Sequence, residues 1–287
     1  MPAAVLVVGA TGMLGRPVAE RLRADGFAVR VLARDPAKAA QVLRDGYEIV
    51  QGAVEDPESL RAALEGCYGV HVSLKAGPER GEPERIEHQG TARVAAMAAE
   101  RGVRRITYLS GCFVDEAHAG TSEAEAAKWR AEQAIERSGV PYTILKPTYF
   151  METLPLHVQG KVAVVLGRQP HPWHMLAAGD FAGIISHVFS NDALPSARHF
   201  VFGPEAITIA DALRRYCDTV EGGKRVLTAP LPVMKALNAT VMRGAMTREL
   251  ALMSIMQREG EPDSAGPDDA LPPATTGLSR WLEGRKG

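Results

Sequence analysis

The chain of 287 residues contains little cysteine: only Cys67, Cys112 and Cys217, which lie far apart. Zinc ligation and redox dithiols need closely spaced cysteines, so we expect neither, and we interpret these three as reduced thiols. No apolar stretch approaches the roughly 20 residues of a membrane span. The apolar start, Ala3 to Val8, follows no basic segment and does not resemble a secretory signal. These features predict a soluble cytoplasmic protein without a metal site.

The sequence also lacks an excess of charge of either sign, since 33 Lys and Arg stand against 34 Asp and Glu. With a net charge of −1, the chain has no overall field to attract nucleic acid or an anionic membrane. Hydrophobic residues make up 46% and charged residues 23%, close to globular averages, which excludes disordered, collagen-like and coiled-coil proteins. We expect a small-molecule substrate, no nucleic acid or membrane partner, and leave a homo-oligomer open.

Up to about residue 147 the sequence alternates short β-branched segments with longer segments of helical periodicity. Such alternation indicates βαβ crossovers and a parallel sheet covered on both faces, so the expected fold class is α/β. The expected strands are Ala4–Val8, Ala28–Ala33, Glu48–Gln51, Gly69–Leu74, Arg105–Leu109 and Tyr142–Leu145. The expected helices are Leu14–Ala24, Pro57–Leu64, Pro83–Arg101 and Ser122–Ser138.

Two helix ends are marked by local chemistry. Asp56 precedes Pro57, and its carboxylate is expected to accept the free amide protons of the helix that begins there. Gly139 follows the helix that ends near Ser138, and Pro141 blocks its continuation. Both signals agree with the alternating pattern.

A glycine-rich loop stands directly between the first expected strand and the first expected helix. Its residues are Gly9, Ala10, Thr11, Gly12, Met13, Leu14 and Gly15. Glycines at such a turn let the backbone approach a pyrophosphate, and the helix that follows offers free N–H groups and the positive end of its dipole. A glycine-rich turn without a ligand is the alternative, but the strand before it and the helix after it favour a dinucleotide-binding loop.

Arg34 ends the second expected strand, roughly 20 residues after the glycine loop, where Rossmann proteins contact the adenosine ribose. A carboxylate at this place would accept the ribose 2′-hydroxyl of NAD, whereas an arginine can pair with the 2′-phosphate of NADP. The sequence therefore favours NADP(H) over NAD(H). Asp35 follows and leaves two alternatives open: it serves NAD, or it pairs on the surface with Arg34 or Lys38.

The glycine loop is one of several stretches whose sequences match the motifs of one protein group. The others are Leu32–Pro36, Gly90–Val103, Tyr108–Ser110, Ser138–Pro147, Phe150–Glu152 and, near the end, Pro273–Thr276 before Trp281. Together they resemble the NmrA-like group of atypical short-chain dehydrogenase/reductases. The resemblance spans most of the chain and is dense up to about residue 153. Thr153 departs from it, because the group commonly carries an Asn there.

The resemblance implies a Rossmann-type doubly wound parallel sheet of about seven strands with a small C-terminal substrate lobe. The group includes NAD(P)H-dependent reductases of quinones and other small molecules, and also proteins that bind the dinucleotide as a signal. We predict an NADP(H)-dependent oxidoreductase that transfers hydride to a small, largely apolar carbonyl or quinone. The alternatives are a non-catalytic NAD(P)-binding sensor and an NAD(P)-dependent isomerase or epimerase.

The regular alternation stops after Pro147. Residues 1–153 are assigned to the dinucleotide-binding Rossmann domain, and residues 179–203 return to its sheet with a helix near Asp180–Phe189 and a strand at His199–Phe202. Residues 154–178 and 204–287 are assigned to a smaller substrate-binding lobe. In this lobe we expect a strand at Val162–Leu166, mostly helix over 204–258 and a loop over 261–273.

Lys128 is aligned by the resemblance with the lysine of the catalytic Tyr-x-x-x-Lys element of short-chain reductases, but Ala124 stands in the tyrosine place. The resemblance implies that Lys128 contacts the nicotinamide ribose and serves in catalysis; the alternative is a solvated lysine. Ser110 ends the fifth strand at the ligand edge of the sheet, as a catalytic residue or a plain terminating serine. Pro147, Tyr149 and Phe150 are expected near the nicotinamide, with Tyr149 as a substitute proton donor or as pocket wall.

Two further clusters of residues each have a packing interpretation and a functional one. His171, Trp173 and His174 are interpreted mainly as packing of the lobe, with a histidine in the substrate pocket as the alternative, because Pro172 breaks any helical alignment of metal ligands. Five of the ten methionines fall between Met234 and Met256. This segment predicts a core-facing helix, or else an adaptable apolar wall or subunit contact.

Overall fold

The computed structural model describes residues 4–262 and 270–285, and its largest sheet has seven strands in the order β11-β6-β5-β4-β1-β2-β3. The neighbouring strands from β6 to β3 all run parallel. This order confirms the Rossmann-type α/β fold. The strands are β1 (Ala4–Val8), β2 (Ala28–Ala33), β3 (Glu48–Gln51), β4 (Cys67–Val72), β5 (Arg105–Leu109), β6 (Tyr142–Pro147) and β11 (Ala197–Val201).

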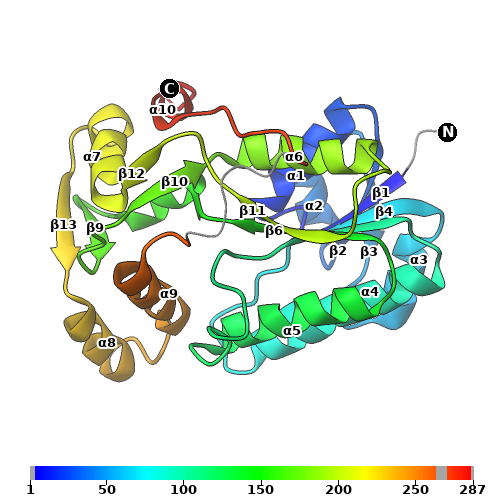
Figure 1. Cartoon of the computed structure of the whole chain (residues 1–287), viewed down its shortest axis with the longest axis horizontal. Helices are drawn as coiled ribbons and strands as arrows, with labels where there is room; N and C mark the ends of the chain where they lie inside the picture. The colour runs from blue at the N-terminus through cyan, green and yellow to red at the C-terminus, as the bar shows by residue number, and fades with distance from the viewer. Residues whose placement is uncertain (1–3, 263–269, 286–287) are drawn as a thin grey trace. The chain divides into compact units, whose positions relative to one another are not determined.

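Helices alternate with the strands of this sheet along the chain (Figure 1). They are α1 (Gly15–Ala24), α2 (Pro36–Leu43), α3 (Pro57–Leu64), η1 (Pro83–Gly90), α4 (Thr91–Glu100), α5 (Glu123–Arg137) and α6 (Ala178–Ser190). The helix expected over Pro83–Arg101 is two elements, because η1 is wound as a π-helix. In η1 the fully buried Glu87 accepts a hydrogen bond from the backbone N–H of Ala76 at 2.8 Å. The helix α2 was not expected from the sequence.

The caps expected from the sequence are present. Asp56 accepts a hydrogen bond from the N–H of Glu58 at 3.1 Å, and Pro57 is the first residue of α3. Gly139 follows α5 with a φ of +74°, the left-handed region in which glycine carries no steric penalty. Local chemistry therefore sets these helix boundaries.

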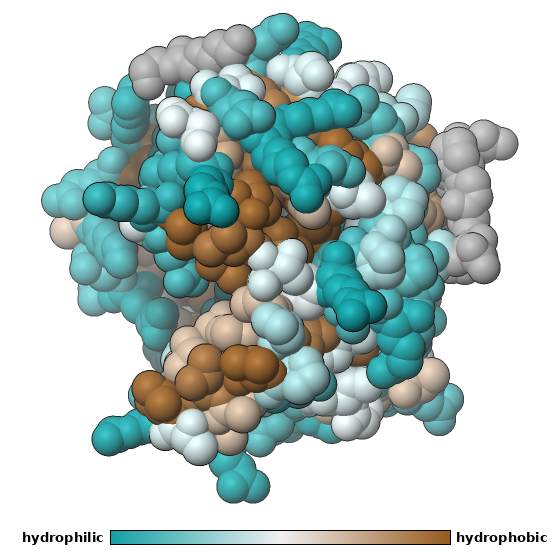
Figure 2. All heavy atoms as spheres, turned by 90° about the vertical axis from the view of Figure 1, so that its left-hand side faces the viewer, coloured by the Kyte–Doolittle hydropathy of each residue, from teal (hydrophilic) through white to brown (hydrophobic). Residues whose placement is uncertain are grey.

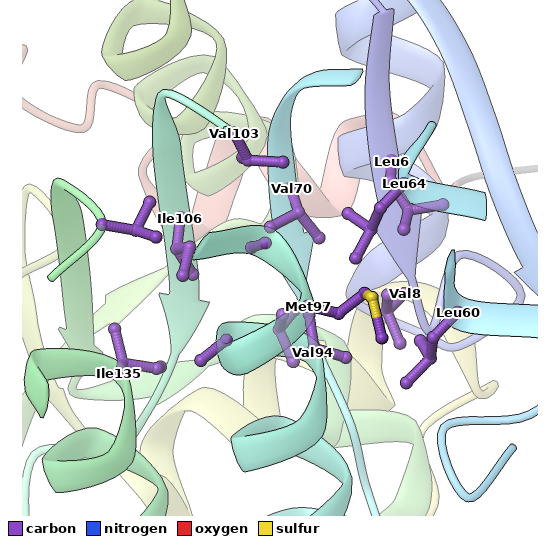
Figure 3. Close-up of a cluster of buried hydrophobic side chains, with 14 of the residues drawn as sticks. Leu6, Val8, Leu60, Leu64, Val70, Val94, Met97, Val103, Ile106 and Ile135 are labelled. Carbon is purple, nitrogen blue, oxygen red and sulfur yellow. The ribbon is translucent and has the colours of Figure 1, made fainter. Parts of the chain in front are cut away.

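One face of the large sheet packs against α3, α4 and α5 (Figure 3). Alternate residues along the strands point to this face, as the period of two in a β-strand requires. Their partners come from one stripe of each helix. The cluster includes Leu6, Val8, Val70, Ile106, Leu60, Leu64, Val94, Met97 and Ile135, all buried. Its continuous apolar contact holds three crossovers against one sheet.

The opposite face lies against α6, from Phe181 onward. A Cβ added at Gly69 would lie 2.4 Å from the Phe189 ring, so the glycine in β4 makes room for that aromatic side chain. His71, next on the same face, contacts the ring of Phe181 edge-on at 6.4 Å. Both faces of the sheet are therefore covered, as its long apolar strands require.

The chain divides into two compact units. Unit 1 comprises residues 1–146, 181–199 and 269–272, and unit 2 comprises residues 147–180, 200–268 and 273–287. Unit 2 contains two sheets of three strands, in the orders β12-β10-β7 and β13-β9-β8. Its other elements are η2 (Met151–His157), α7 (Ile209–Val220), α8 (Leu231–Thr240), α9 (Thr247–Glu259) and α10 (Leu278–Glu283). Its strands are β7 (Tyr149–Phe150), β8 (Val158–Gln159), β9 (Val162–Leu166), β10 (Pro172–Leu176), β12 (Ala206–Thr208) and β13 (Arg225–Ala229).

The expectation of mostly helix over 204–258 is confirmed by α7, α8 and α9, but the strands β12 and β13 within this range were not expected. Both strands are short, and β13 is largely exposed, so its residues show neither the alternation nor the apolar run of a buried strand. The strand at Val162–Leu166 is confirmed as β9. Of the loop expected over 261–273, residues 263–269 lie outside the described residues.

The methionine-rich segment contributes to the core through α9 only. Met253 and Met256 are buried, and the side chain of Gln169 fastens α9 to β9 by donating to the carbonyls of Leu166 at 2.8 Å and Met253 at 2.9 Å. The adjoining stretch exposes Val233, Leu237 and Val241 by 53%, 42% and 71%. Figure 2 views the side on which α8 lies in Figure 1 and shows apolar side chains at the surface.

Carboxylates of unit 2 hold the C-terminal segment. Asp180 accepts hydrogen bonds from the N–H groups of Thr275 and Thr276, each at 2.7 Å. Glu152 accepts from the indole N–H of Trp281 at 2.8 Å and from the N–H of Ala178 at 3.0 Å. The two distant stretches that carried the family resemblance, residues 150–152 and 273–281, are therefore joined by the hydrogen bond from Trp281 to Glu152.

His71 makes folding stability depend on pH. Its Nδ1 pairs with Thr107 Oγ1 at 2.9 Å, while its Nε2 is buried with no hydrogen-bond partner among the described residues. Burial lowers the pKa of His71 from 6.5 to about 3. As the pH falls, the unfolded chain therefore binds a proton at His71 at a higher pH than the folded protein does. The free energy of unfolding should fall by about 1.4 kcal/mol per pH unit as the pH drops from 6.5 toward 3.

Denaturant titrations of the parent and His71→Asn between pH 7 and pH 4 measure this slope. The variant keeps a polar atom near Thr107 but removes the titration, so its stability should depend less on pH even though it is less stable at pH 7. His187→Asn, at an exposed histidine of α6, is the matched control and should keep the parent's slope. Equal slopes for the parent and His71→Asn would contradict the assignment.

Candidate dinucleotide-binding site

The glycine loop lies between the end of β1 and the start of α1. Two of its glycines allow backbone segments to pack closely against each other. Gly9 has a φ of +89°, and a Cβ there would lie 2.2 Å from the carbonyl oxygen of Ser73. A Cβ at Gly15 would lie 2.2 Å from the carbonyl oxygen of Gly9. Any side chain at either place would push the backbone apart. These two glycines therefore set the turn and the approach of the helix.

Gly12 differs from them, because a Cβ there would meet only the carbonyl oxygen of Gly9, at 3.2 Å. Thr11, Gly12 and Met13 are exposed, and the N-terminus of α1 has no side-chain cap and no acidic residue in its first turn. The positive end of the helix dipole is thus open to an anion, and at Gly12 no side chain stands in the way. The loop as folded fits the pyrophosphate of a dinucleotide.

The position of this loop in the sheet agrees with that fit. β1 lies between β2 and β4, and the chain runs outward from it in one direction through β2 and β3 and in the other through β4, β5 and β6. Ligands of such sheets bind beyond the carboxyl ends of the strands where the order reverses. The loop stands at this reversal.

Arg34 follows β2 directly and is exposed. β2 runs parallel to β1, so Arg34 stands at the same edge of the sheet as the glycine loop. Asp35 has another partner: its carboxylate accepts the N–H of Lys38 at 3.0 Å and caps α2. Asp35 therefore caps α2 through one carboxylate oxygen, and the exposed Arg34 stands next to it at the end of β2.

Two side chains of α5 meet the end of β5. The Nζ of the buried Lys128 donates to the carbonyl oxygen of Leu109 at 3.1 Å and lies 5.4 Å from the centre of the Tyr108 ring. Ser110, the next residue of the chain, donates its hydroxyl proton to the carboxylate of Glu132. Lys128 is therefore not a solvated lysine, and Ser110 already has a partner for its proton.

Glu132 is a residue that the sequence analysis missed. It is fully buried, and its second oxygen accepts the Nε–H of Arg198 at 2.8 Å. Its spacing of four from Lys128 places both side chains on one face of α5, and that spacing was the signal in the sequence. Another missed residue is Lys146, buried at the end of β6, which donates to the carbonyl oxygen of Val114 at 2.6 Å.

Tyr149 and Phe150 form β7 and belong, with Pro147, to unit 2. The hydroxyl of Tyr149 lies 2.8 Å from Nε2 of His157, whose Nδ1 lies 2.8 Å from the carbonyl oxygen of Val164. A carbonyl only accepts, so Nδ1 carries the proton and Tyr149 donates to Nε2. Burial raises the pKa of Tyr149 to about 12 and lowers the pKa of His157. Tyr149 therefore stays neutral, with its proton directed at His157.

The imidazole cluster of unit 2 is engaged in packing. Trp173 is fully buried in β10, and His174 Nδ1 pairs with Glu261 at 2.6 Å. Within residues 4–262 and 270–285, no group of three or more His, Cys, Asp or Glu side chains is arranged to hold a metal ion. The same part of the chain has no helix both long enough and apolar enough to span a membrane.

Residues 9–191 of the chain match the NAD(P)H-binding family. A reductase from Streptomyces griseus, (4-alkanoyl-5-oxo-2,5-dihydrofuran-3-yl)methyl phosphate reductase, is 36% identical over 71% of this chain and 69% of its own. The NAD(P)H azoreductase of Xenophilus azovorans is 25% identical over 94% of this chain and 92% of its own.

Among solved structures, the Citrobacter sp. triphenylmethane reductase complexed with NADP(H) superposes with a TM-score of 0.75 at 21% identity, covering 98% of this chain and 99% of its own. That likeness shows that the two proteins share a fold over nearly the whole of this chain. Together with the glycine loop at the reversal of strand order, these matches lead to one assignment. The chain belongs to the NAD(P)H-binding family, as an NAD(P)H-dependent oxidoreductase of the NmrA-like group of atypical short-chain dehydrogenase/reductases.

Proposed function

We propose that this protein uses NADPH to reduce a small, largely apolar carbonyl or quinone compound. The proposal rests on one observation: three features lie at the carboxyl edge of the same parallel sheet. They are the open glycine loop after β1, Arg34 after β2 and the buried Lys128 against the end of β5. By its name, the Streptomyces relative reduces a small compound that carries alkanoyl and oxo groups and a phosphate.

NADPH supplies the hydride when bound, and the residues of the chain bind and orient it. Residues Gly9, Thr11, Gly12, Met13, Leu14 and Gly15 offer backbone N–H groups and the N-terminus of α1 to the pyrophosphate. Arg34 offers a planar set of donors to the 2′-phosphate. We also propose that Pro147 and Phe150 take part in binding the nicotinamide.

In this proposal Lys128 provides the positive charge of the reaction site. Its ammonium is held by the carbonyl of Leu109 and the ring of Tyr108, so its position is fixed before a substrate arrives. Such a group binds the nicotinamide ribose and stabilises the negative charge that grows on the substrate oxygen as hydride arrives. Ala124 provides no proton donor four residues earlier, and the proton of Tyr149 is directed at His157. We therefore assign the polar catalysis to Lys128 and only a minor part to Tyr149.

A sensor that binds the dinucleotide without turnover is the second candidate. Two observations favour it. Ala124 stands in the place of the usual catalytic tyrosine, and Tyr149 donates its proton to His157, so neither residue is free to give a proton to a substrate. Oxidation of NADPH on addition of a panel of quinones and carbonyl compounds separates the two functions.

The glycine loop gives the first prediction. Gly12→Val should abolish binding of NADPH and NADH, because the branched side chain occupies the space through which the pyrophosphate approaches, while the protein still folds. Gly15→Ala is the informative contrast, since its Cβ clashes with backbone and should destabilise the fold itself. Fluorescence titration measures the cofactor affinity of each variant, and thermal melting measures its stability. Normal cofactor affinity in a folded Gly12→Val variant would show that the loop is not the binding site.

Arg34 tests the choice of cofactor. Arg34→Ala should weaken NADPH binding by about 1.5 to 3 kcal/mol, the usual range for a charge-assisted hydrogen bond, and leave NADH binding nearly unchanged. Lys38→Ala, at a nearby exposed cation, is the control and should affect both cofactors little. Equal losses of NADPH and NADH affinity in Arg34→Ala would reject the assignment.

Lys128 tests the reaction. The parent should oxidise NADPH with at least one quinone or carbonyl compound of the panel, and Lys128→Met should lower turnover by about 10²-fold or more, with a smaller loss of NADPH affinity. Arg130→Met, at an exposed cation of the same helix, should leave turnover intact. Tyr149→Phe should be comparatively mild.

The opposite ranking, with Tyr149 essential and Lys128 dispensable, would transfer the polar catalysis to Tyr149. If the parent binds NADPH but turns over no compound of the panel, the sensor function is favoured instead.

A further inference from the structure

The hydrogen bond between Ser110 and Glu132 fixes the polarity of the hydroxyl group at the end of β5. Ser110 is 6% exposed and Glu132 is fully buried, so water does not compete for either group. The guanidinium of Arg198 forms an ion pair with Glu132 at 2.8 Å, and an ionised carboxylate can only accept. The Ser110 proton is therefore committed to Glu132, and its oxygen has only lone pairs to offer elsewhere.

We propose that Glu132 is a positioning residue that makes Ser110 a hydrogen-bond acceptor, and that Ser110 binds a donor group on the nicotinamide half of the dinucleotide. Two donors of that half qualify: the carboxamide N–H and the ribose hydroxyls. A carbonyl or quinone substrate has no proton to give, so it does not pair with such an acceptor. This inference rests on the dinucleotide site of the proposed function and assigns Ser110 to the cofactor instead of the substrate.

Arg198 keeps the carboxylate in place. It comes from β11 and also forms an ion pair through Nη1 with Glu136 at 2.8 Å, one turn further along α5. The guanidinium therefore spans two successive carboxylates of one helix, and its carbon lies 5.2 Å from the ring centre of Trp129. With Arg198 donating to one oxygen of Glu132, only the other oxygen faces Ser110.

The same geometry predicts what an amide would do. In Glu132→Gln the amide oxygen should face Arg198, which can only donate, so the amide N–H group should face Ser110. Ser110 would then accept from Gln and turn its own proton outward. The substitution thus reverses the polarity of Ser110 while keeping the size of the side chain.

Fluorescence titration of NADPH measures the consequence without any turnover. Ser110→Ala should weaken binding by about 3- to 10-fold, the range for one neutral hydrogen bond, and Glu132→Gln by about as much. Glu136→Gln, which breaks the other ion pair of Arg198 but does not touch Ser110, is the matched control and should stay within about twofold of the parent. Adding Glu132→Gln to Ser110→Ala should cost no further affinity, because Glu132 acts through Ser110.

The acetylpyridine analogue of NADPH, which has no carboxamide N–H, identifies the donor. If Ser110→Ala weakens NADPH but not the analogue, the carboxamide is the donor; equal weakening of both assigns the ribose hydroxyls. This arm also stands if Glu132→Gln fails to fold, which thermal melting would show.

Unchanged NADPH affinity in Ser110→Ala would overturn the proposal. It would also be overturned if Glu132→Gln lowered NADPH affinity by the same factor in the Ser110→Ala variant as in the parent protein. Because these readouts are binding constants, they remain separate from turnover. A parent that reduces no quinone or carbonyl compound but shows this binding pattern would refute the proposed reaction and leave the role of Ser110 intact.

Discussion

The close contact of backbone with backbone at Gly9 and Gly15 is the constraint on which the rest of the site depends. The chain leaves β1 with Gly9 in the left-handed region, close against Ser73, and returns one turn later so that Gly15 passes over the Gly9 carbonyl. No side chain fits between these segments. The direction of α1 follows from this contact, and the exposed N–H groups at its start follow from that direction.

The inner face of α5 is the second organising feature. The large sheet is covered by apolar helix stripes, yet this helix also brings an ammonium and a carboxylate against the carboxyl end of β5. Each charge is matched: Lys128 by a carbonyl and an aromatic ring, and Glu132 by Ser110 and Arg198. Buried polar groups satisfied in this way are held rigidly, which suits a site that must keep its groups aligned.

In unit 2, carboxylates that accept backbone and indole protons hold the C-terminal segment. Glu152, Asp180 and Glu205 each bind part of the segment from Thr275 to Trp281. The resemblance to the NmrA-like group at Phe150–Glu152 and near Trp281 thereby has a structural explanation, since Glu152 and Trp281 are hydrogen-bonding partners. Neither stretch alone indicates this pairing.

The sequence by itself determined the elements that depend on neighbours along the chain. β-branched runs indicate strands β1, β2, β3 and β5 at the observed bounds, and Asp56 and Gly139 mark helix ends, because strand periodicity and helix caps are visible in neighbouring residues. The glycine loop before α1 predicts the candidate dinucleotide site from its place between a strand and a helix. Only the tertiary structure decided where the polar side chains direct their protons. Ser110 meets Glu132 across 22 residues, and Arg198 reaches Glu132 across 66. A hydrogen bond depends on distance and direction between groups that folding brings together, and residue type alone does not specify either.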